Sequence, residues 1–297
     1  MDRQASWEPA PDSGIAIRWV EANGLTFEVA EAGSGGKLAL CLHGFPELHY
    51  SWRHQMPHLA RLGYRVWAPN MRGYGGTDRP DGIDAYRLDS LAADVAALID
   101  VAQADEVTLI AHDWGAIVAW YFANRQLRPL KRLVILNVPH PICARREMRH
   151  WRQLRKSWYI FLFQLPWLPE RMLGRDGAAP IRRIFRDSAV NKRRFSDAEV
   201  EPYRRAAARP GALTAMINYY RALLRRPDMR AIGNGQVDVP TLVLWGEQDV
   251  ALDIHLLDGM DEFVPRLTVQ RFPDASHWVQ QDIPDEINAA LSDWLAR

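Results

Sequence analysis

The sequence is poor in cysteine: only Cys41 and Cys143 occur in 297 residues. Two distant thiols are too few for a disulfide framework, and their spacing is not that of a metal-binding pair. We therefore expect a protein of a reducing compartment, the cytoplasm, with no metal site.

Long apolar runs are also missing. The first residues contain no apolar segment long enough for a signal peptide, and no run approaches the roughly 20 residues of a membrane span. The apolar run from Trp158 to Leu168 offers membrane contact as an alternative, but it is too short to span, and we expect it to form pocket wall and lid core. These features predict a protein with no membrane partner.

An excess of charge of one sign is absent from the whole chain, since 37 Lys and Arg face 36 Asp and Glu. This balance excludes a nucleic-acid binder by composition. Locally the charge is uneven: residues 145–230 hold 21 basic and 8 acidic side chains. The arginines there are not interleaved with base-stacking aromatics. We expect a separate structural unit with a solvated basic face and no nucleic-acid partner.

Hydrophobic periodicity predicts alternating strands and helices. The expected strands are Ile15 to Val20, Leu25 to Ala30, Leu38 to Leu42, Arg65 to Ala68, Val107 to Ala111, Leu133 to Asn137, Thr241 to Trp245 and Leu267 to Phe272. The expected helices are Tyr50 to Leu62, Leu88 to Ala102, Trp114 to Asn124, Ala251 to Met260 and Asp285 to Leu295. This alternation indicates an α/β fold with a mainly parallel eight-stranded sheet, covered by helices on both faces, whose first two strands form an antiparallel hairpin.

The alternation stops between Pro139 and about Gly233, where helical, arginine-rich segments replace strands. We expect residues 1–138 and 234–297 to form the core and residues 139–233 a helical cap (lid) inserted after the sixth strand. Such an insertion leaves the sheet at the carboxyl end of one strand. It would therefore cover the face where ligands bind in open α/β sheets.

One carboxylate stands at a position that points to covalent chemistry. Residues 107–115 read V-T-L-I-A-H-D-W-G, an apolar strand that feeds a tight turn and then a helix. This arrangement is typical of a nucleophile elbow, which displays one side chain above the sheet. Here that side chain is Asp113. The structural alternative is an acid that caps the following helix.

A carboxylate nucleophile suits attack on a saturated carbon. The product is an ester, whose carbonyl water can later open, whereas serine at the same carbon would leave an inert ether. The expected substrates are therefore alkylating agents rather than acyl donors.

Five motifs, in order, carry a resemblance to a known family. They are H-G-F-P-E from His43, R-G-Y-G-G-T-D-R-P from Arg72, H-D-W-G from His112, W-G-E-Q-D from Trp245 and S-H-W-V-Q-Q-D-I-P from Ser276. Together they span nearly the whole chain, which resembles the epoxide hydrolases of the α/β-hydrolase fold, with haloalkane dehalogenases as close relatives. The resemblance implies an oxyanion hole made by the backbone amides of Phe45 and Trp114, and a cis peptide bond before Pro46.

The base and its acid follow from chain order. In an elbow hydrolase the order is nucleophile, acid, histidine, and Asp113, Asp249 and His277 obey it. Asp249 would orient the imidazole of His277. Glu247 competes with Asp249, and Asn137 stands where some relatives place the acid.

The resemblance also implies a pair of tyrosines in the lid that protonate the opening epoxide. Tyr159 and Tyr220 are our candidates, with Tyr219 left open as the alternative to Tyr220. We expect a substrate-binding pocket lined by His43, Pro46, Phe161, Phe163, Trp167 and Tyr219.

The sequence thus predicts hydrolysis of a small apolar epoxide to a vicinal diol by water, with no cofactor, in a monomer or homodimer. Dehalogenation is the alternative, since Trp167 could hold a leaving halide. A non-catalytic ligand receptor of the same fold is a third possibility.

Overall fold

An eight-stranded sheet forms the centre of the molecule. The computed structural model describes residues 3–225 and 234–297. The strands are β1 Ile15–Ala22, β2 Leu25–Ala32, β3 Lys37–Leu42, β4 Arg65–Pro69, β5 Glu106–His112, β6 Arg132–Leu136, β7 Thr241–Gly246 and β8 Leu267–Phe272, in the order β1-β2-β4-β3-β5-β6-β7-β8. β2 pairs antiparallel with β1 and β4, and the other pairs are parallel. The predicted mainly parallel sheet and its antiparallel first hairpin are confirmed.

Helices cover both faces of this sheet, because the central strands are apolar on both sides. On one face, α1 (Gln55–Arg61) and α12 (Pro284–Leu295) pack against alternate strand residues such as Ala39 and Cys41. On the other face, α2 (Leu88–Ala102) and α3 (Trp114–Asn124) pack against the intervening leucines of β3. Both cysteines are buried and free.

Two predicted helices differ from the structure. The first, Tyr50 to Leu62, is split into a 3-10 turn, η1 (His49–Trp52), and α1. The second, Ala251 to Met260, is instead two 3-10 turns, η5 (Ile254–Leu257) and η6 (Met260–Glu262). There, the side chains of Asp249 and Asp253 accept backbone hydrogen bonds from the following residues. Such local bonds compete with an α-helix.

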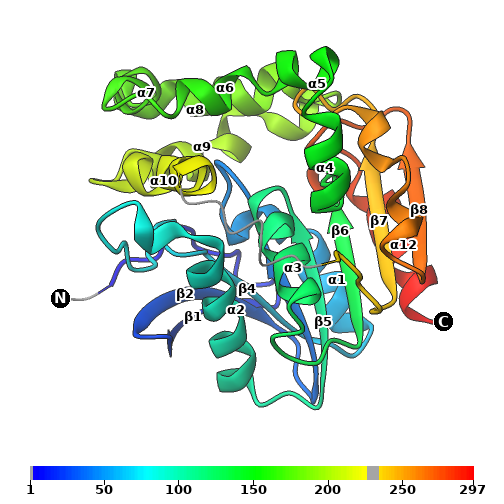
Figure 1. The fold of residues 1–297 in the computed structure, drawn as a ribbon. Helices are drawn as coiled ribbons and strands as arrows, with labels where there is room; N and C mark the ends of the chain where they lie inside the picture. Colours follow the sequence, from blue (N-terminus) through cyan, green and yellow to red (C-terminus); the bar gives the residue numbers. More distant parts are fainter. Residues whose placement is uncertain (1–2, 226–233) are drawn as a thin grey trace.

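Between β6 and β7 the described chain contains helices and turns but no strand of the sheet (Figure 1). The helices are α4 Pro141–Glu147, α5 Trp151–Lys156, α6 Trp158–Leu162, α7 Leu168–Leu173, α8 Arg175–Ser188, α9 Asp197–Ala207 and α10 Ala212–Arg225. In Figure 1, α5 to α8 form the layer farthest from the sheet, and α9 and α10 lie beneath it. The end of the predicted insertion, 226–233, lies outside the described residues.

The short elements η2 (Asp84–Tyr86), η3 (Lys192–Phe195) and α11 (Val279–Asp282) complete the described structure. No helix within residues 3–225 and 234–297 combines the length and the apolar character that crossing a bilayer requires.

Candidate active site

Asp113 occupies a sharp turn between β5 and α3. Its backbone has φ 47° and ψ −121°, a left-handed conformation that a non-glycine residue rarely adopts. Its side chain accepts no capping hydrogen bond from the helix that follows, so the helix-cap alternative does not describe this residue. The strained turn instead displays the carboxylate at the carboxyl edge of the sheet.

Two glycines make room for this turn. A Cβ atom on Gly44 would lie 2.2 Å from Oδ1 of Asp113, and one on Gly115 would lie 2.5 Å from the carbonyl oxygen of Leu42. Both distances are shorter than real contacts. The two glycines of H-G-F-P-E and H-D-W-G are therefore required so that the β3 turn and the elbow can meet.

The turn after β3 points a backbone donor at Asp113. The amide of Phe45 donates to Oδ1 of Asp113 at 2.6 Å, and the Phe45-Pro46 peptide is cis, as expected. Trp114 is the first residue of α3, where the amides have no partner within the helix. The Phe45 amide thus contacts the carboxylate, and the Trp114 amide begins the helix that follows it.

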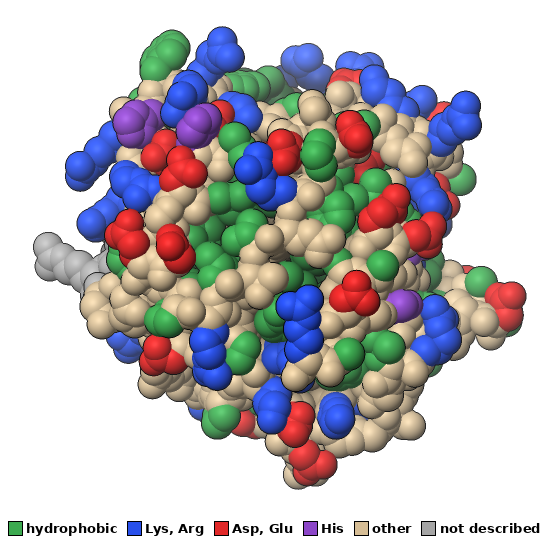
Figure 2. Space-filling view, turned by 90° about the vertical axis from the view of Figure 1, so that its right-hand side faces the viewer, with side chains coloured by type: hydrophobic (Ala, Val, Ile, Leu, Met, Phe, Trp, Pro, Cys, Tyr) green, Lys and Arg blue, Asp and Glu red, His purple; other side chains and the backbone are tan. Residues whose placement is uncertain are grey.

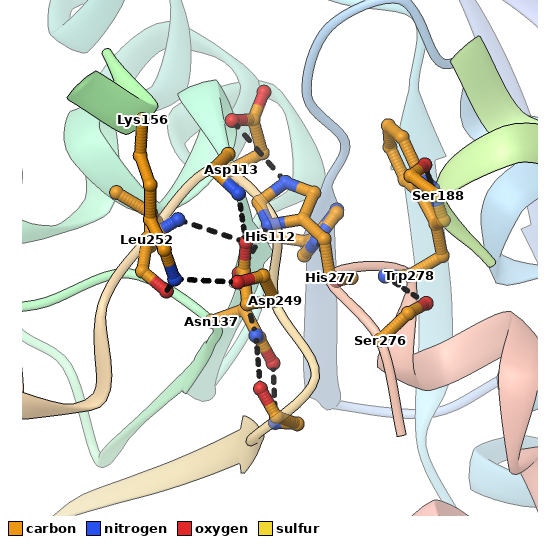
Figure 3. Close-up of polar contacts among 12 residues, drawn as sticks. His112, Asp113, Asn137, Lys156, Ser188, Asp249, Leu252, Ser276, His277 and Trp278 are labelled. Atoms are coloured by element: carbon orange, nitrogen blue, oxygen red, sulfur yellow. Dashed lines mark hydrogen bonds and ion pairs between the residues drawn. The ribbon is translucent and has the colours of Figure 1, made fainter. Parts of the chain in front are cut away.

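His277 lies between two carboxylates (Figure 3). Its Nδ1 is 2.6 Å from Oδ2 of Asp249, and its Nε2 is 3.6 Å from Oδ2 of Asp113. Burial alone would lower the pKa of His277, but the charges of Asp249 and Asp113 raise it well above its usual value. Burial would raise the pKa of Asp113, yet His277 and the Phe45 amide hold it below the ordinary aspartate value.

Asp249 has a complete set of hydrogen-bond donors. Oδ1 accepts from the amides of Ala251 and Leu252 at 2.7 and 2.9 Å, and Oδ2 accepts from Nδ2 of Asn137 at 2.8 Å. Asn137 also exchanges hydrogen bonds with the backbone of Gly246, which joins the ends of β6 and β7. The competing carboxylate, Glu247, pairs instead with Arg271 at 2.8 Å.

The candidate tyrosines differ in what they contact. Tyr219 donates to the carbonyl of Arg72 at 2.8 Å and is fully buried, so its hydroxyl is already used by the backbone. Tyr220, by contrast, packs edge-on against Trp114 with ring centroids 4.9 Å apart. The ring centroid of Tyr159 lies 5.8 Å from that of Tyr220. Burial, followed by the charge of Asp113, raises the pKa of both Tyr159 and Tyr220.

This geometry changes the predicted pocket wall. The ring centroid of Phe163 lies 4.9 Å from that of Tyr220 and 5.5 Å from that of Phe45. Pro46, which follows Phe45, is also buried. The assignments of Phe161 and Trp167 are wrong, because these side chains are 52% and 63% exposed on the outer helices. Their apolar character alone did not reveal that these two side chains face solvent.

Two further residues assigned to the pocket have other tasks. Tyr219 does not offer its hydroxyl to the site, as described above. His43 is fully buried, with Nδ1 2.9 Å from the carbonyl of Gly44 and Nε2 accepting from the amide of Met71 at 3.0 Å. Burial lowers the pKa of His43 to about 4. At neutral pH the ring is therefore uncharged, and its hydrogen bonds stabilise the turn.

A buried pair behind the site was missed by the sequence analysis. Nδ1 of His112 lies 2.7 Å from Glu47, and its Nε2 lies 2.8 Å from the carbonyl of His277. Both contacts are to acceptors, so the pair must hold one proton more than a neutral imidazole and a carboxylate. Glu47 also accepts from the amide of Gly44 at 2.9 Å. The pair therefore links the turn after β3 to the backbone of His277. In the sequence, Glu47 ends the motif H-G-F-P-E and His112 begins the motif H-D-W-G.

The paired charges predict a pH dependence of stability. Because the folded pKa of His277 is raised above its unfolded value of roughly 6.5, its contribution is fully present below that pH and is lost as pH rises through the folded pKa. The deficit in unfolding free energy of His277→Gln relative to wild type should shrink between about pH 6 and pH 9. Urea denaturation at each pH measures it. A deficit that grows with pH would contradict the ion-pair assignment.

Within the part of the chain that the structure describes, no cluster of three or more His, Cys, Asp or Glu side chains is arranged to hold a metal ion.

Comparison with known proteins identifies the family. A family described as "alpha/beta hydrolase fold" matches residues 40–283. The chain is 36% identical to AB hydrolase superfamily protein YfhM of Bacillus subtilis (strain 168), covering 95% of this chain and 98% of the relative. It is 38% identical to Epoxide hydrolase 2 of Caenorhabditis elegans, covering 90% of this chain and 76% of the relative.

Solved structures give the same result. A Bacillus megaterium epoxide hydrolase in complex with an inhibitor superposes with a TM-score of 0.86 at 29% identity, covering 94% of this chain and 100% of that one. Epoxide Hydrolase A from Mycobacterium thermoresistibile superposes with a TM-score of 0.83 at 32% identity, covering 95% of this chain and 98% of the other.

Proposed function

Because this chain belongs to the α/β-hydrolase family, as an epoxide hydrolase-like hydrolase, we propose that it converts a small apolar epoxide to a vicinal diol through a covalent ester on Asp113. The observation that carries this proposal is the position of Asp113. The imidazole of His277 lies 3.6 Å from its carboxylate, and Tyr220, whose ring packs on the elbow residue Trp114, adjoins Tyr159.

In the first half of the reaction, Asp113 attacks a ring carbon of the epoxide and the carbon–oxygen bond breaks. Tyr159 and Tyr220 donate to the oxygen, and one of them transfers its proton as the alkoxide forms. The phenols suit this role because burial keeps them protonated at neutral pH. Phe45, Phe163 and Trp114 surround them with apolar surface suited to an apolar substrate.

Ester formation changes the charge that His277 experiences. The carboxylate of Asp113 helps to keep the imidazole protonated in the free enzyme, and that charge is lost when the ester forms. The pKa of His277 then falls, and its proton can return to the tyrosinate. The neutral imidazole, still oriented by Asp249, can now take a proton from water.

In the second half, this activated water attacks the ester carbonyl. The amides of Phe45 and Trp114 receive the negative charge that develops on the carbonyl oxygen. Collapse breaks the bond to the product oxygen, which takes the remaining proton of the former water molecule, so the diol leaves and the carboxylate of Asp113 is restored beside a protonated His277. The sum of the two halves is epoxide plus water to diol, with no other reactant.

Residues 139–233 act in this proposal as a cap over the core formed by 1–138 and 234–297. Their α10 contributes Tyr220, which packs on the elbow residue Trp114 and the turn residue Phe45 of the core, and α6 contributes Tyr159, which packs on Tyr220. A cap of this kind excludes bulk water, which would otherwise weaken the hydrogen bonds to the epoxide oxygen.

A substrate panel tests the proposed function. Purified protein is incubated separately with a styrene-type epoxide, an aliphatic epoxide, a haloalkane and a carboxylic ester, and diol, halide and acid are quantified together. We expect diol from at least one epoxide and no halide. Halide release without diol would favour the dehalogenase, although Trp167 is exposed and lends that alternative no support. Tight ligand binding without any product would favour a receptor.

A further inference from the structure

The outermost helices carry large apolar side chains that no part of the described protein covers. Five of them fall within one short segment: Trp151, Trp158, Phe161, Leu165 and Trp167, exposed by 75%, 61%, 52%, 45% and 63%. Among the residues described, every Trp or Phe that is exposed to this degree lies in this segment. Exposed apolar side chains gathered in this way mark a surface that contacts another phase or partner.

The exposed side chains lie on two helices and in the turn that follows them. Trp151 begins α5, and Trp158 and Phe161 lie three residues apart on α6, the spacing of one helix face. Leu165 and Trp167 lie in the turn between α6 and α7. The opposite side points inward, since Gln153, Ser157 and Phe163 are buried. Gln153 donates to the carbonyl of Ala251 at 2.9 Å. The inner side therefore packs on the core, and the outer side is exposed, with Arg155 and Trp158 also lining an open cleft beside Glu247 and Val250.

The same segment has charge of one sign only. Residues 148–169 contain Arg149, Arg152, Arg155 and Lys156 and no Asp or Glu. Lys156 is used internally, because its Nζ donates to the carbonyl of Asp249 at 2.8 Å. The three arginines are exposed, and none pairs with a carboxylate of the described chain. In Figure 2, Lys and Arg side chains line the upper edge of the molecule, with hydrophobic side chains among them.

We propose that this outer face, residues 149–167, binds the surface of an anionic lipid bilayer. Tryptophan and phenylalanine insert at the level of the headgroups, where one end of the ring meets water and the other meets acyl chains. Arginines beside them pair with anionic headgroups. α5 and α6 belong to the layer farthest from the sheet (Figure 1), so the rest of the protein does not stand between them and a bilayer. The segment was expected to be interior, which was the reason for expecting no membrane contact.

The alternative occupants fit these features less well. In a face-to-face contact between two copies, the unpaired arginines of one would meet those of the other, and like charges would repel. Proteins that bind single-stranded nucleic acid stack bases in a positively charged groove. Here the side chains project from the outside of helices, and they include the aliphatic Leu165.

Vesicle co-sedimentation of the full chain tests the inference. We expect binding to vesicles of phosphatidylcholine with phosphatidylglycerol, weak binding to phosphatidylcholine alone, and release at about 0.5 M NaCl, where exposed charges are screened. Tryptophan emission should shift to shorter wavelength on binding. The variant Arg149→Gln/Arg152→Gln/Arg155→Gln should bind about 100-fold more weakly, because each cation near an anionic surface contributes roughly fivefold.

The aromatic side chains are tested with Trp151→Ser/Trp158→Ser, which should lose at least about tenfold of the affinity. The matched control, Leu62→Ser/Val101→Ser, removes two exposed apolar side chains elsewhere and should bind like wild type. A cooperative melting transition in every variant would show that it is folded, so that weaker binding is not a result of misfolding. Failure to sediment with anionic vesicles at low salt would overturn the inference. So would a dimer that the Trp double variant dissociates, or equal binding to single-stranded RNA. None of these outcomes depends on the proposed reaction.

Discussion

His277→Gln is expected to accept one substrate molecule and then stop. Glutamine retains a polar side chain near Asp113 but cannot take a proton from water, so the ester should form and persist. Loss of a general base costs roughly 10²–10⁴-fold in rate, and steady-state diol formation should fall by about that factor. Intact-mass spectrometry should find the protein heavier by the mass of the epoxide, and peptide mapping should place the addition on Asp113.

Two controls make this result specific. His255→Gln removes an exposed histidine that pairs with Asp253 and should leave turnover unchanged. Asp113→Asn/His277→Gln lacks the nucleophile and should show no added mass. In wild-type protein, a single turnover in ¹⁸O-labelled water should leave the label in the Asp113 carboxylate, because water attacks the carbonyl carbon of the ester. An unlabelled Asp113, or an adduct at another residue, would contradict covalent catalysis.

The tyrosine pair should affect the other half of the reaction. Tyr159→Phe/Tyr220→Phe removes both proton donors while keeping the aromatic packing around Phe45 and Trp114. Without them the alkoxide would form unprotonated, and we expect alkylation of Asp113 to slow by roughly 10²–10⁴-fold. Each single variant should lose less, since the remaining phenol still donates. Single-turnover kinetics, which separate ester formation from ester hydrolysis, provide the measurement.

Tyr219→Phe is the matched control for this experiment. It removes the same hydroxyl from the neighbouring residue, whose hydrogen bond goes to the carbonyl of Arg72. The expected cost is about 1 kcal/mol of stability, visible as earlier unfolding in urea, with little change in alkylation rate. A slow Tyr219→Phe beside a fast Tyr220→Phe would reverse the assignment of the proton donor.

Some features of the site followed directly from short stretches of sequence. The elbow at Asp113 requires an apolar strand, small residues and a following helix, all of which are adjacent in the chain. The strands were predicted to within two residues at most ends, because buried parallel strands are short apolar runs bounded by turn residues. The positions of Asp249 and His277 followed from the order of motifs.

Other features depend on contacts between distant segments. Tyr219 and Tyr220 are neighbours on α10, and only the packing of that helix decides which of them bonds to the carbonyl of Arg72 and which packs on the elbow residue Trp114. The predicted helix after Asp249 fails because Asp249 and Asp253 bond to their own following amides. The link from Glu47 through His112 to His277 joins the end of β5 to two loops that no local pattern connects with it.

The sequence by itself determined the α/β sheet and named the residues of the proposed chemistry: a carboxylate on an elbow, a histidine and its acid. These are set by residue identity and by spacing along the chain. The tertiary structure alone decided which side chains face the site and which face solvent, as Phe163 and Phe161 do on one short helical segment. The physical reason is that burial depends on which other segments pack against a residue. The hydrophobicity of a side chain is the same whether it faces the core or solvent.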